Sequence, residues 1–321
     1  MELDPIDRGV IHALNMDGRA SFSRIGDVMG VSDQTVARRY RRLRAANVAR
    51  VVGLSLPWRV GEMRWYVRLR CAPDVAVSVA SALAARNDAY WVRMLSGGTE
   101  IDCVIQGRDH HEPGTLLLQK LPRTPRVLDV SAHSLLYVYL GGPDEHCGIV
   151  DGLTKDQAAA LKPHVQQLDE VIPLDEGDHR MLTVLERDGR AGFADIAAAT
   201  GWSESTAKRR LDYLRDTGAV YFDVDMDMCA LGFPVEARVW MSVPPYQLHE
   251  VGQALARHPE VVFVAATTGA RNLVASIACR TVKDFYTYLT EKLGAIRAVR
   301  NVETAPVIRT VKRGATLLTE T

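Results

Sequence analysis

The sequence of 321 residues lacks the features that mark membrane and secreted proteins. No apolar run approaches the roughly 20 residues that a membrane-spanning helix needs. The opening MELDPIDRGV is too acidic and polar for a secretory signal, so we expect none. Cysteine is scarce and forms no C-x-x-C pair, which predicts reduced, mostly buried thiols in a cytoplasmic protein. The five cysteines are Cys71, Cys103, Cys147, Cys229 and Cys279.

The signatures of common enzyme and metal sites are also missing from the sequence. It contains no GxGxxG, no P-loop and no G-x-S-x-G, so nothing predicts nucleotide or hydrolase chemistry. His110, His111 and Glu112, taken with His133, do not have the spacing of a zinc site, and we expect neither a metal nor a cofactor. The net charge is zero, so any DNA-binding surface must be a local patch.

What the sequence does contain is a long internal repeat. The segment LDPIDRGVIHALNMDGRASFSRIGDVMGVSDQTVARRYRRLRAANV begins at Leu3. It aligns without a gap, at an offset of 171, with LDEGDHRMLTVLERDGRAGFADIAAATGWSESTAKRRLDYLRDTGAV, which begins at Leu174. The segments that follow align more loosely, at an offset of 171 to 172. We therefore predict two copies of a unit of about 140 residues, each a helical head followed by a second domain.

Boundaries follow from the repeat and from the Gly/Pro-rich stretch that begins at Gly141. The predicted helix-turn-helix heads are residues 1–50 and 173–222, the second domains are 58–140 and 230–315, and 141–172 is a linker with a helix from Thr154 to Leu168.

Each head has the pattern of three short amphipathic helices. In the first head, Asp4 and Pro5 predict a helix start, Gly30 predicts a tight turn, and Ser32 predicts the cap of a third helix. This is the layout of a helix-turn-helix, although a plain three-helix bundle has the same outline. On the third helix the spacing predicts one core-facing side made by Val36, Tyr40, Leu43 and Asn47.

The outward side of this third helix decides between the two interpretations. From Ser32 to Arg50 there are six arginines and one acidic residue, a net charge of +5. A solvated helix usually mixes charges, so we expect these arginines to lack a neutralising partner within the protein and to bind double-stranded DNA. Arginine also reads guanine, and glutamine can read adenine. The predicted DNA-binding residues are Ser32, Gln34, Thr35, Arg38, Arg39, Arg41 and Arg42.

The second head is less basic, with a net charge of +1 from Ser203 to Tyr221. Asp212 stands where the first head has Arg41, and a carboxylate there would face phosphates. We expect the first head to dominate DNA binding, with the second reading a half-site weakly or serving as a dimer surface. Its candidate DNA-binding residues are Ser203, Ser205, Thr206, Lys208, Arg209 and Arg210.

After each head the chain alternates in the order β-α-β-β-α-β, the ferredoxin-like plan. The fold class is therefore α+β: two three-helix or winged-type heads alternating with two ferredoxin-like domains. The first copy is predicted at 64–71, 76–85, 89–95, 101–106, 113–121 and 127–140, preceded by a strand at 49–56, and the second copy at 236–243, 246–257, 261–267, 272–278, 283–293 and 302–311.

With its L-D-x-x-D…L…D-G-R opening, its G-V-S turn and its β-α-β-β-α-β domain, the sequence resembles the Lrp/AsnC (feast/famine) transcriptional regulators. The resemblance implies a non-enzymatic regulator whose third helix binds DNA and whose αβ domains pair into homo-oligomers. It also implies small effectors, usually amino acids, bound near the glycine turn between the two middle strands. On this sequence the effector positions are Ser96, Gly97, Glu100, Asp102, Thr268, Gly269 and Asn272.

Two departures from the family pattern stand out. The family turn commonly carries an aspartate where this sequence has Glu100 in one copy and Asn272 in the other, so two unlike pockets are expected. The tandem chain also differs from the usual single-module member.

The alternative to a DNA-binding regulator is an enzyme: the siroheme decarboxylases resemble this chain in architecture. An enzyme of this kind would require catalytic histidine and arginine residues in the αβ domain. His133 and His249 are possible but isolated, and the basic helix would be left unexplained.

Overall fold

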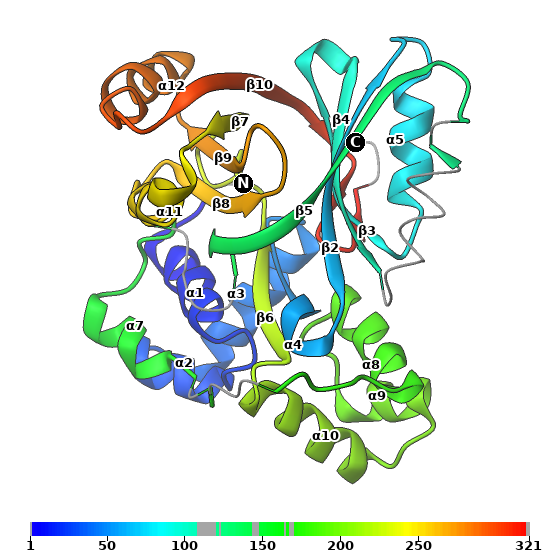
Figure 1. The fold of residues 1–321 in the computed structure, drawn as a ribbon. Coiled ribbons are helices and arrows are strands. Elements are labelled where there is room, and N and C mark those ends of the chain that lie inside the picture. The colour runs from blue at the N-terminus through cyan, green and yellow to red at the C-terminus, as the bar shows by residue number, and fades with distance from the viewer. Residues whose placement is uncertain are drawn as a thin grey trace. The chain divides into compact units, whose positions relative to one another are not determined.

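The computed structural model describes residues 2–107, 120–121, 123–142, 148–163, 165–166 and 170–318. The chain forms two compact units, and each unit takes one part from each repeat (Figure 1). The first unit combines residues 1–61 with 150–231 and holds both helical heads. The second combines 62–149 with 232–321 and holds both αβ domains. The repeats therefore do not fold as consecutive, independent modules. None of the helices among these residues is long and apolar enough to span a membrane.

Both heads have the predicted three helices, and the N-caps of the first and third helices repeat from one head to the other. Asp4 accepts a hydrogen bond from the Asp7 backbone N–H at 2.9 Å, and the Asp7 side chain accepts one from the Asp4 N–H. Gly30 ends the second helix with φ of +70°, a conformation that glycine adopts at little cost. The helices are α1 (Pro5–Met16), α2 (Phe22–Met29) and α3 (Asp33–Ala45), then α8 (Glu176–Arg187), α9 (Phe193–Thr200) and α10 (Glu204–Asp216).

The core side of α3 is smaller than the sequence predicts. Val36, Tyr40 and Leu43 are buried as expected. Asn47 is not: the helix ends at Ala45, and Asn47 is exposed with φ of +54°. The prediction was wrong at this position because it extended helical periodicity past the end of the helix.

The two heads are joined by a two-stranded antiparallel ribbon. Strand β1 (Ala49–Ser55) of the first repeat pairs with β6 (Val220–Met226) of the second, and Val52 lies opposite Asp223. Since the repeat offset is 171, these two residues are equivalent, and the ribbon has a local pseudo-twofold axis at this pair. The sequence predicted β1 but neither β6 nor the pairing. A short helix, α4 (Pro57–Val60), follows β1.

Reciprocal arginine contacts hold the heads together around the same pseudo-axis. Arg19 donates to the backbone oxygens of Gly189, at 2.9 Å, and Ala191. Its counterpart Arg190 donates to Gly18 O at 2.7 Å and lies over the ring of Phe22. Two ion pairs repeat in the same way: Arg44 with Asp188 at 2.9 Å, and Arg215 with Asp17 at 3.1 Å. The heads therefore form an intramolecular pseudo-dimer.

The linker helix docks on the first head. Helix α7 (Lys155–Leu161) packs against α1 and α2, where Arg24 donates to Ala160 O at 2.7 Å and Gln157 donates to Val28 O at 2.8 Å. The predicted helix was too long, because Pro163 cannot continue it. Residues 164 and 167–169 of that prediction lie outside the described residues.

The first αβ domain of the second unit follows the predicted order. The helix α5 covers a core that includes Leu69 and Ile105 on one face of the sheet. The predicted helix at 113–121 lies outside the described residues, except for its last two positions. The elements are β2 (Met63–Cys71), α5 (Ala76–Ala84), β3 (Ala89–Leu95), the short 3-10 turn η1 (Ser96–Gly98), β4 (Glu100–Gly107) and β5 (Val127–Leu140).

The second αβ domain repeats the plan, and the ferredoxin-like prediction is confirmed. Its last helix is split, because the α-helical turn continues as a π-helical one. The elements are β7 (Val235–Ser242), η3 (Pro245–Gln247), α11 (Leu248–Ala256), β8 (Val261–Thr267), β9 (Leu273–Cys279), α12 (Val282–Thr287), η4 (Tyr288–Leu293) and β10 (Arg300–Thr310), followed by β11 (Lys312–Arg313) and β12 (Thr316–Leu317).

The two four-stranded sheets close into one barrel in the order β10-β3-β4-β2-β5-β8-β9-β7. The last strand of each domain pairs with the edge strand, β3 or β8, of the other domain. Leu135 on β5 pairs with Thr267 on β8, and Val307 on β10 pairs with Leu95 on β3. The second pairing is the first one shifted by 172 residues, so the seams are equivalent. Closure leaves no free edge in the main sheet.

Candidate nucleic-acid interface and effector turns

The start of α3 is fixed by its own hydroxyl groups. Ser32 Oγ accepts from the Thr35 backbone N–H at 3.2 Å, and the two side-chain oxygens lie 2.9 Å apart. These two predicted DNA-binding residues thus build the N-cap of α3. Ser32 is exposed and Thr35 half-exposed, at the helix N-terminus, which is the end that would meet a phosphate.

The outward face of α3 carries Gln34, Arg38 and Arg41, and all three are exposed. Arg41 Nε donates to Ala37 O at 3.3 Å, so its side chain folds back along its own helix. In the described part of the chain no carboxylate lies within ion-pair distance of Arg38 or Arg41. These three side chains are placed as the DNA-binding prediction requires.

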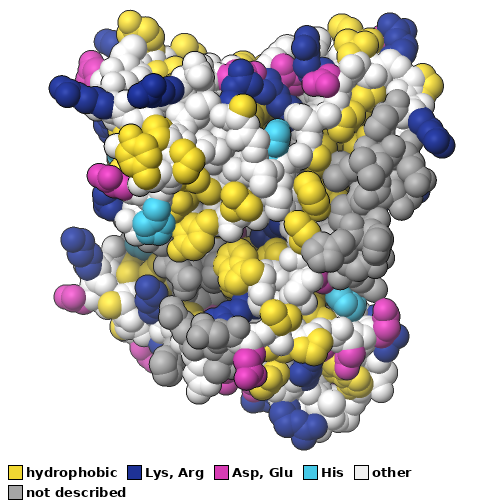
Figure 2. Space-filling view, in the orientation of Figure 1, with side chains coloured by type: hydrophobic (Ala, Val, Ile, Leu, Met, Phe, Trp, Pro, Cys, Tyr) yellow, Lys and Arg dark blue, Asp and Glu magenta, His cyan; other side chains and the backbone are white. Residues whose placement is uncertain are grey.

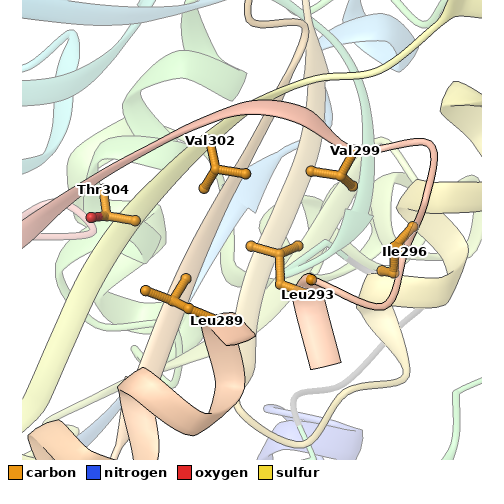
Figure 3. Close-up of a pocket in the computed structure, with 7 residues that line it drawn as sticks. Leu289, Leu293, Ile296, Val299, Val302 and Thr304 are labelled. Carbon is orange, nitrogen blue, oxygen red and sulfur yellow. The ribbon is translucent and has the colours of Figure 1, made fainter. Parts of the chain in front are cut away.

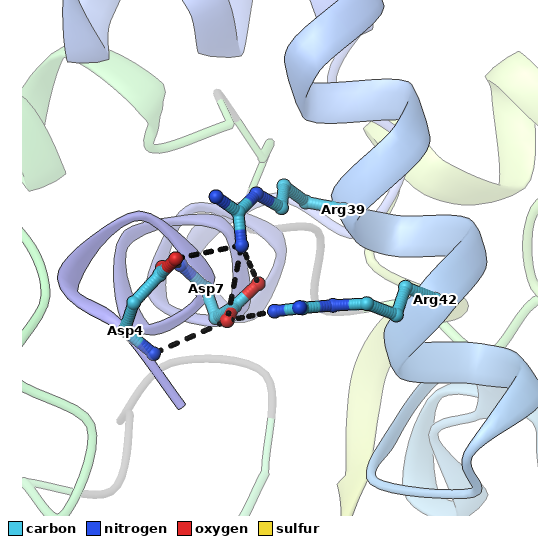
Figure 4. A network of polar contacts seen from close by, with 4 residues as sticks. All are labelled: Asp4, Asp7, Arg39 and Arg42. Atoms are coloured by element: carbon cyan, nitrogen blue, oxygen red, sulfur yellow. Dashed lines mark hydrogen bonds and ion pairs between the residues drawn. The ribbon is translucent and has the colours of Figure 1, made fainter. Parts of the chain in front are cut away.

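Arg39 and Arg42 are not placed in that way, and here the expectation that the arginines lack internal partners was wrong (Figure 4). Arg39 Nη1 pairs with Asp4 at 2.7 Å and with Asp7 at 3.4 Å, and Arg42 pairs with Asp7 as well. The Asp7 side chain is fully buried. The Asp7 backbone N–H, with Arg39, lowers the pKa of Asp4 below its usual value. Both arginines therefore pair with the buried Asp7 carboxylate and tie α3 to α1.

The two remaining arginines between Ser32 and Arg50, one on α3 and one on β1, are also engaged. Arg44 pairs with Asp188 of the other head, and Arg50 donates to the Asn47 side chain. Among the arginines of α3, Arg38 and Arg41 are therefore the ones without an ion-pair partner in the described residues. On the face drawn in Figure 2, basic side chains occur singly or in small groups among acidic ones.

In the second head, α10 has the same serine N-cap as α3, but most of its basic side chains are paired with carboxylates. Ser203 Oγ accepts from the Thr206 N–H at 3.2 Å and also contacts the hydroxyls of Ser205 and Thr206. Lys208 pairs with Asp212 at 2.7 Å on the exposed surface.

Of the two arginines predicted on α10, one is structural and one is exposed. Arg210, the counterpart of Arg39, makes a two-pronged contact with the buried Asp178, at 2.8 and 2.6 Å. Hydrogen bonding to this carboxylate raises the pKa of Arg210. Arg209, the counterpart of Arg38, is exposed, and no carboxylate of the described residues pairs with it.

The first effector turn follows β3. Ser96, Gly97 and Gly98 all have positive φ, which makes a tight turn before β4. Glu100, the predicted effector residue after this turn, pairs with Arg68 at 2.7 Å. Its carboxylate already has a guanidinium partner in this structure.

Asp102 lies in the interior of the barrel, away from solvent. Its Oδ2 accepts from the Tyr66 hydroxyl at 2.7 Å and from Arg238 Nε at 2.6 Å. Burial and the carboxylate raise the pKa of Tyr66 far above its usual value. The neighbouring Arg93 donates to Trp91 O, and burial together with Arg238 lowers the pKa of Arg93 to about 10. The contacts of Asp102 are those of an internal ion pair.

The second predicted effector turn keeps the glycine of the first, but Thr268 and Asn272 replace Ser96 and Glu100. Thr268 is bonded to Ser134 of β5 in both directions, through its N–H and its Oγ1. Gly269 has φ of +100°, and a Cβ there would lie 2.5 Å from His133 Nδ1. Asn272 bridges both backbone groups of Val243, at 2.9 and 2.8 Å.

An apolar pocket of about 360 Å³ lies elsewhere on the second αβ domain, between η4 and β10 (Figure 3). None of the predicted effector residues lines it. Its lining residues are Leu289, Leu293, Gly294, Ile296, Val299, Val302 and Thr304. His110, His111 and Glu112 lie outside the described residues, and within those residues no group of three or more His, Cys, Asp or Glu side chains could hold a metal ion.

Comparison with known proteins follows the same division into heads and αβ domains. The AsnC-type helix-turn-helix domain matches residues 3–44 and again 174–215, and the Lrp/AsnC ligand binding domain matches 236–317. The HTH-type transcriptional regulator FL11 of Pyrococcus horikoshii is 33% identical over 142 residues, which are 44% of this chain and 93% of that protein. The chain belongs to the Lrp/AsnC family of transcriptional regulators. FL11 of Pyrococcus abyssi is 30% identical over 142 residues, 44% of this chain and 93% of that regulator. These relatives have the length of one repeat, so this Lrp/AsnC protein holds two modules in one chain.

A solved structure covers nearly the whole tandem chain. The crystal structure of the siroheme decarboxylase NirDL superposes with a TM-score of 0.65, covering 96% of this chain and 92% of that one, at 13% sequence identity. At an identity this low, the superposition shows a shared fold and nothing more: both proteins have the same tandem architecture. The family match and the fold confirm the predicted family and the predicted fold class.

Sequence reasoning missed the residues that join the repeats. The internal repeat itself carried one signal for the Asp7 cluster, because Asp7 and Arg39 recur together as Asp178 and Arg210. A pair that is kept in both copies while Arg42 becomes Tyr213 indicates a structural contact. No comparable signal marked Arg238 as the partner of Asp102, because their equivalents are uncharged.

Proposed function

We propose that this protein binds a specific DNA sequence chiefly through α3 of the first head, and that its αβ domains respond to small effectors. The observation that carries the proposal is the pair Arg38 and Arg41. Both are exposed beside Gln34, and no carboxylate of the described residues pairs with them, whereas Arg39 and Arg42 are neutralised by Asp7. Guanidinium groups in such a position can bind phosphates or fork onto guanine.

The second head contributes less to binding in this proposal. The Lys208–Asp212 pair cancels one cation on α10, and Arg210 is held by Asp178. Arg209 is left as the main basic contact. Because the heads are held as a pseudo-dimer, α3 and α10 would meet two half-sites of one operator, of which the first is bound more tightly.

The effector positions stay a proposal built on the two glycine turns. Glu100 and Arg68 near the first turn, and His133 and Asn272 near the second, give the two sites different chemistry. We expect an amino acid or a related metabolite at one of them, and further assembly of chains through the αβ domains. Such a regulator would act in the cytoplasm.

The test is DNA binding by the full chain to its own upstream region, followed by fluorescence anisotropy at increasing salt and repeated with a panel of amino acids. A steep loss of affinity with salt supports phosphate contacts by the heads. An amino acid that shifts the midpoint identifies the effector class. The absence of binding even at low salt would overturn the proposal.

A second arm of this test addresses the alternative. The likeness of fold to NirDL extends over the whole chain, and NirDL has also been solved with an iron-uroporphyrin III analogue. When the same analogue is mixed with this protein, the Soret band of the analogue should not shift. A saturable Soret shift without DNA binding would favour the enzyme.

A further inference from the structure

The inner faces of the two αβ sheets carry charges that differ between the copies. The strand registers repeat after 172 residues: Arg68 lies opposite Asp102 in the pair β2–β4, and Trp240 lies opposite Val274 in the pair β7–β9. Every inner-face position of one domain can therefore be matched to a position of the other. A dimer of identical domains would show each contact twice. In this barrel the charged contacts occur once each.

The first of these contacts joins Asp102 of the first domain to Arg238 of the second, at 2.6 Å. Both residues are buried, with 0% and 5% of their surface exposed. The equivalent positions hold Val274 in the second domain and Tyr66 in the first, so the symmetry-related contact carries no charge. Burying two charges costs desolvation energy, which their mutual contact offsets.

The second contact joins Arg68 of the first domain to Glu303 of the second. Arg68 also lies 4.0 Å from the ring centre of Trp240, its own counterpart. Glu303 corresponds to Ser131, since Ser131 lies opposite Arg68 just as Glu303 lies opposite Trp240. Each of these two side chains also has an ion partner in its own domain, Glu100 for Arg68 and Arg271 for Glu303, and the symmetry-related contact is uncharged.

Pairing of like domains would separate Asp102 from Arg238 and Arg68 from Glu303, and it would leave Asp102 and Arg238 as the buried charges without an ion partner across the interface. Two first domains would bring Asp102 against Tyr66 without Arg238 and would bring one Arg68 against another. Two second domains would bury Arg238 against Val274 and would place Glu303 against Trp240. An unpaired buried charge is strongly destabilising, whereas the pairing of unlike domains leaves none at these positions.

We propose that these two ion pairs make the barrel interface selective: the inner face of the first αβ domain accepts the second αβ domain and rejects another first domain, from a second chain or from a single-module relative. The partner of each face is thus chemically defined. The first domain presents a buried carboxylate and a stacked guanidinium, and it requires a guanidinium and a carboxylate in return. The interface then closes within one chain.

The test replaces each residue of one pair by its counterpart from the other domain in the full chain. Asp102→Val should lower the Tm by about 10 °C, because it leaves Arg238 and the Tyr66 hydroxyl without a partner. Arg238→Tyr should also lower the Tm. The double variant, which makes the two faces alike and uncharged at these positions, should recover most of the loss. Asp74→Asn, which breaks the exposed pair with Arg126, is the control and should leave the Tm almost unchanged.

Selectivity has its own measurement. Two tagged versions of each protein are co-expressed, and the fraction that is captured through both tags is compared with that of the unaltered chain. The double variant should show more mixed species, and the mixed fraction should rise with protein concentration, because like domains of different chains can now pair.

The second ion pair provides an independent test if the first double variant does not fold. Arg68→Trp with Glu303→Ser makes those positions alike in both domains and should increase mixing in the same way. Unchanged Tm in both single variants of the first pair would overturn the role of that pair. Mixed fractions equal to that of the unaltered chain in the folded double variants would overturn selectivity.

Discussion

The arginines of α3 allow DNA contact to be separated from structural support, because neighbours in sequence have opposite surroundings. Arg38 is exposed, and no described carboxylate pairs with it. The Arg39 side chain is 18% exposed and pairs with Asp4 and Asp7. We therefore predict that Arg38→Ala weakens DNA binding without lowering the Tm, and that Arg39→Ala lowers the Tm with little change in the salt dependence of binding.

The magnitudes follow from the contacts. Losing one phosphate contact lowers the slope of log affinity against log salt by about 1, and losing a guanine contact costs about 1–3 kcal/mol. Arg39→Ala leaves the buried Asp7 with Arg42 alone and removes the ion partner of Asp4. Loss of one charged partner while another remains should cost about 1–3 kcal/mol of unfolding free energy, or about 5 °C in Tm.

Both variants are measured by fluorescence anisotropy on the upstream DNA at several salt concentrations and by thermal unfolding without DNA. The second head supplies matched controls at the equivalent positions. Arg209→Ala should have a smaller effect on affinity than Arg38→Ala, and Arg210→Ala should lower the Tm through Asp178. Equal loss of salt dependence in Arg38→Ala and Arg39→Ala, with the Tm unchanged in both, would refute the distinction between free and paired arginines.

Three further predictions concern the joints between the repeats. Burial raises the pKa of Asp223 to about 7, so the destabilisation caused by its ionisation grows as the pH rises from about 4 to about 7. Asp223→Asn should therefore raise the Tm by a few degrees at pH 8 and by less than half as much at pH 5, and an equal gain at both pH values would contradict this. Arg19→Ala removes hydrogen bonds to backbone oxygens of the other head and should lower the Tm by several degrees; no change would show that the heads do not depend on them. Gly269→Ala places a Cβ against His133 at positive φ, whereas the Cβ of Gly97→Ala has open space. Gly269→Ala should therefore lower the Tm more than Gly97→Ala does, and the reverse order in thermal unfolding would contradict the turn geometry.

Local pattern was sufficient for most of the secondary structure. Caps such as Ser32, alternation such as that of β2, and the repeat itself predict elements close to their observed bounds, because these signals depend on near neighbours in sequence. The failures at Asn47 and beyond Leu161 occurred where periodicity was extended past a helix end.

The pairing between repeats could not be predicted from such signals. Strand β5 pairs with β8 and β1 with β6, across more than 100 residues of sequence in each case. Nothing in a strand's own composition identifies its partner when several strands have similar apolar faces. The role of Arg39 was missed for the same reason, since Asp7 lies 32 residues before it in sequence.

Placing two modules in one chain removes a constraint that applies to dimers of identical chains. In such a dimer every residue at the axis meets its own copy, so a charge there must be tolerated twice. Here Val52 lies opposite Asp223, Arg68 lies over Trp240, and Asp102 has no charged equivalent. The same freedom extends to the DNA-binding helices, where Arg41 is matched by Asp212. An operator for this protein should therefore depart from a perfect palindrome, with stronger sequence requirements in the half that meets α3, and a perfectly symmetric sequence preference would show that the two heads read DNA equally despite their different charges.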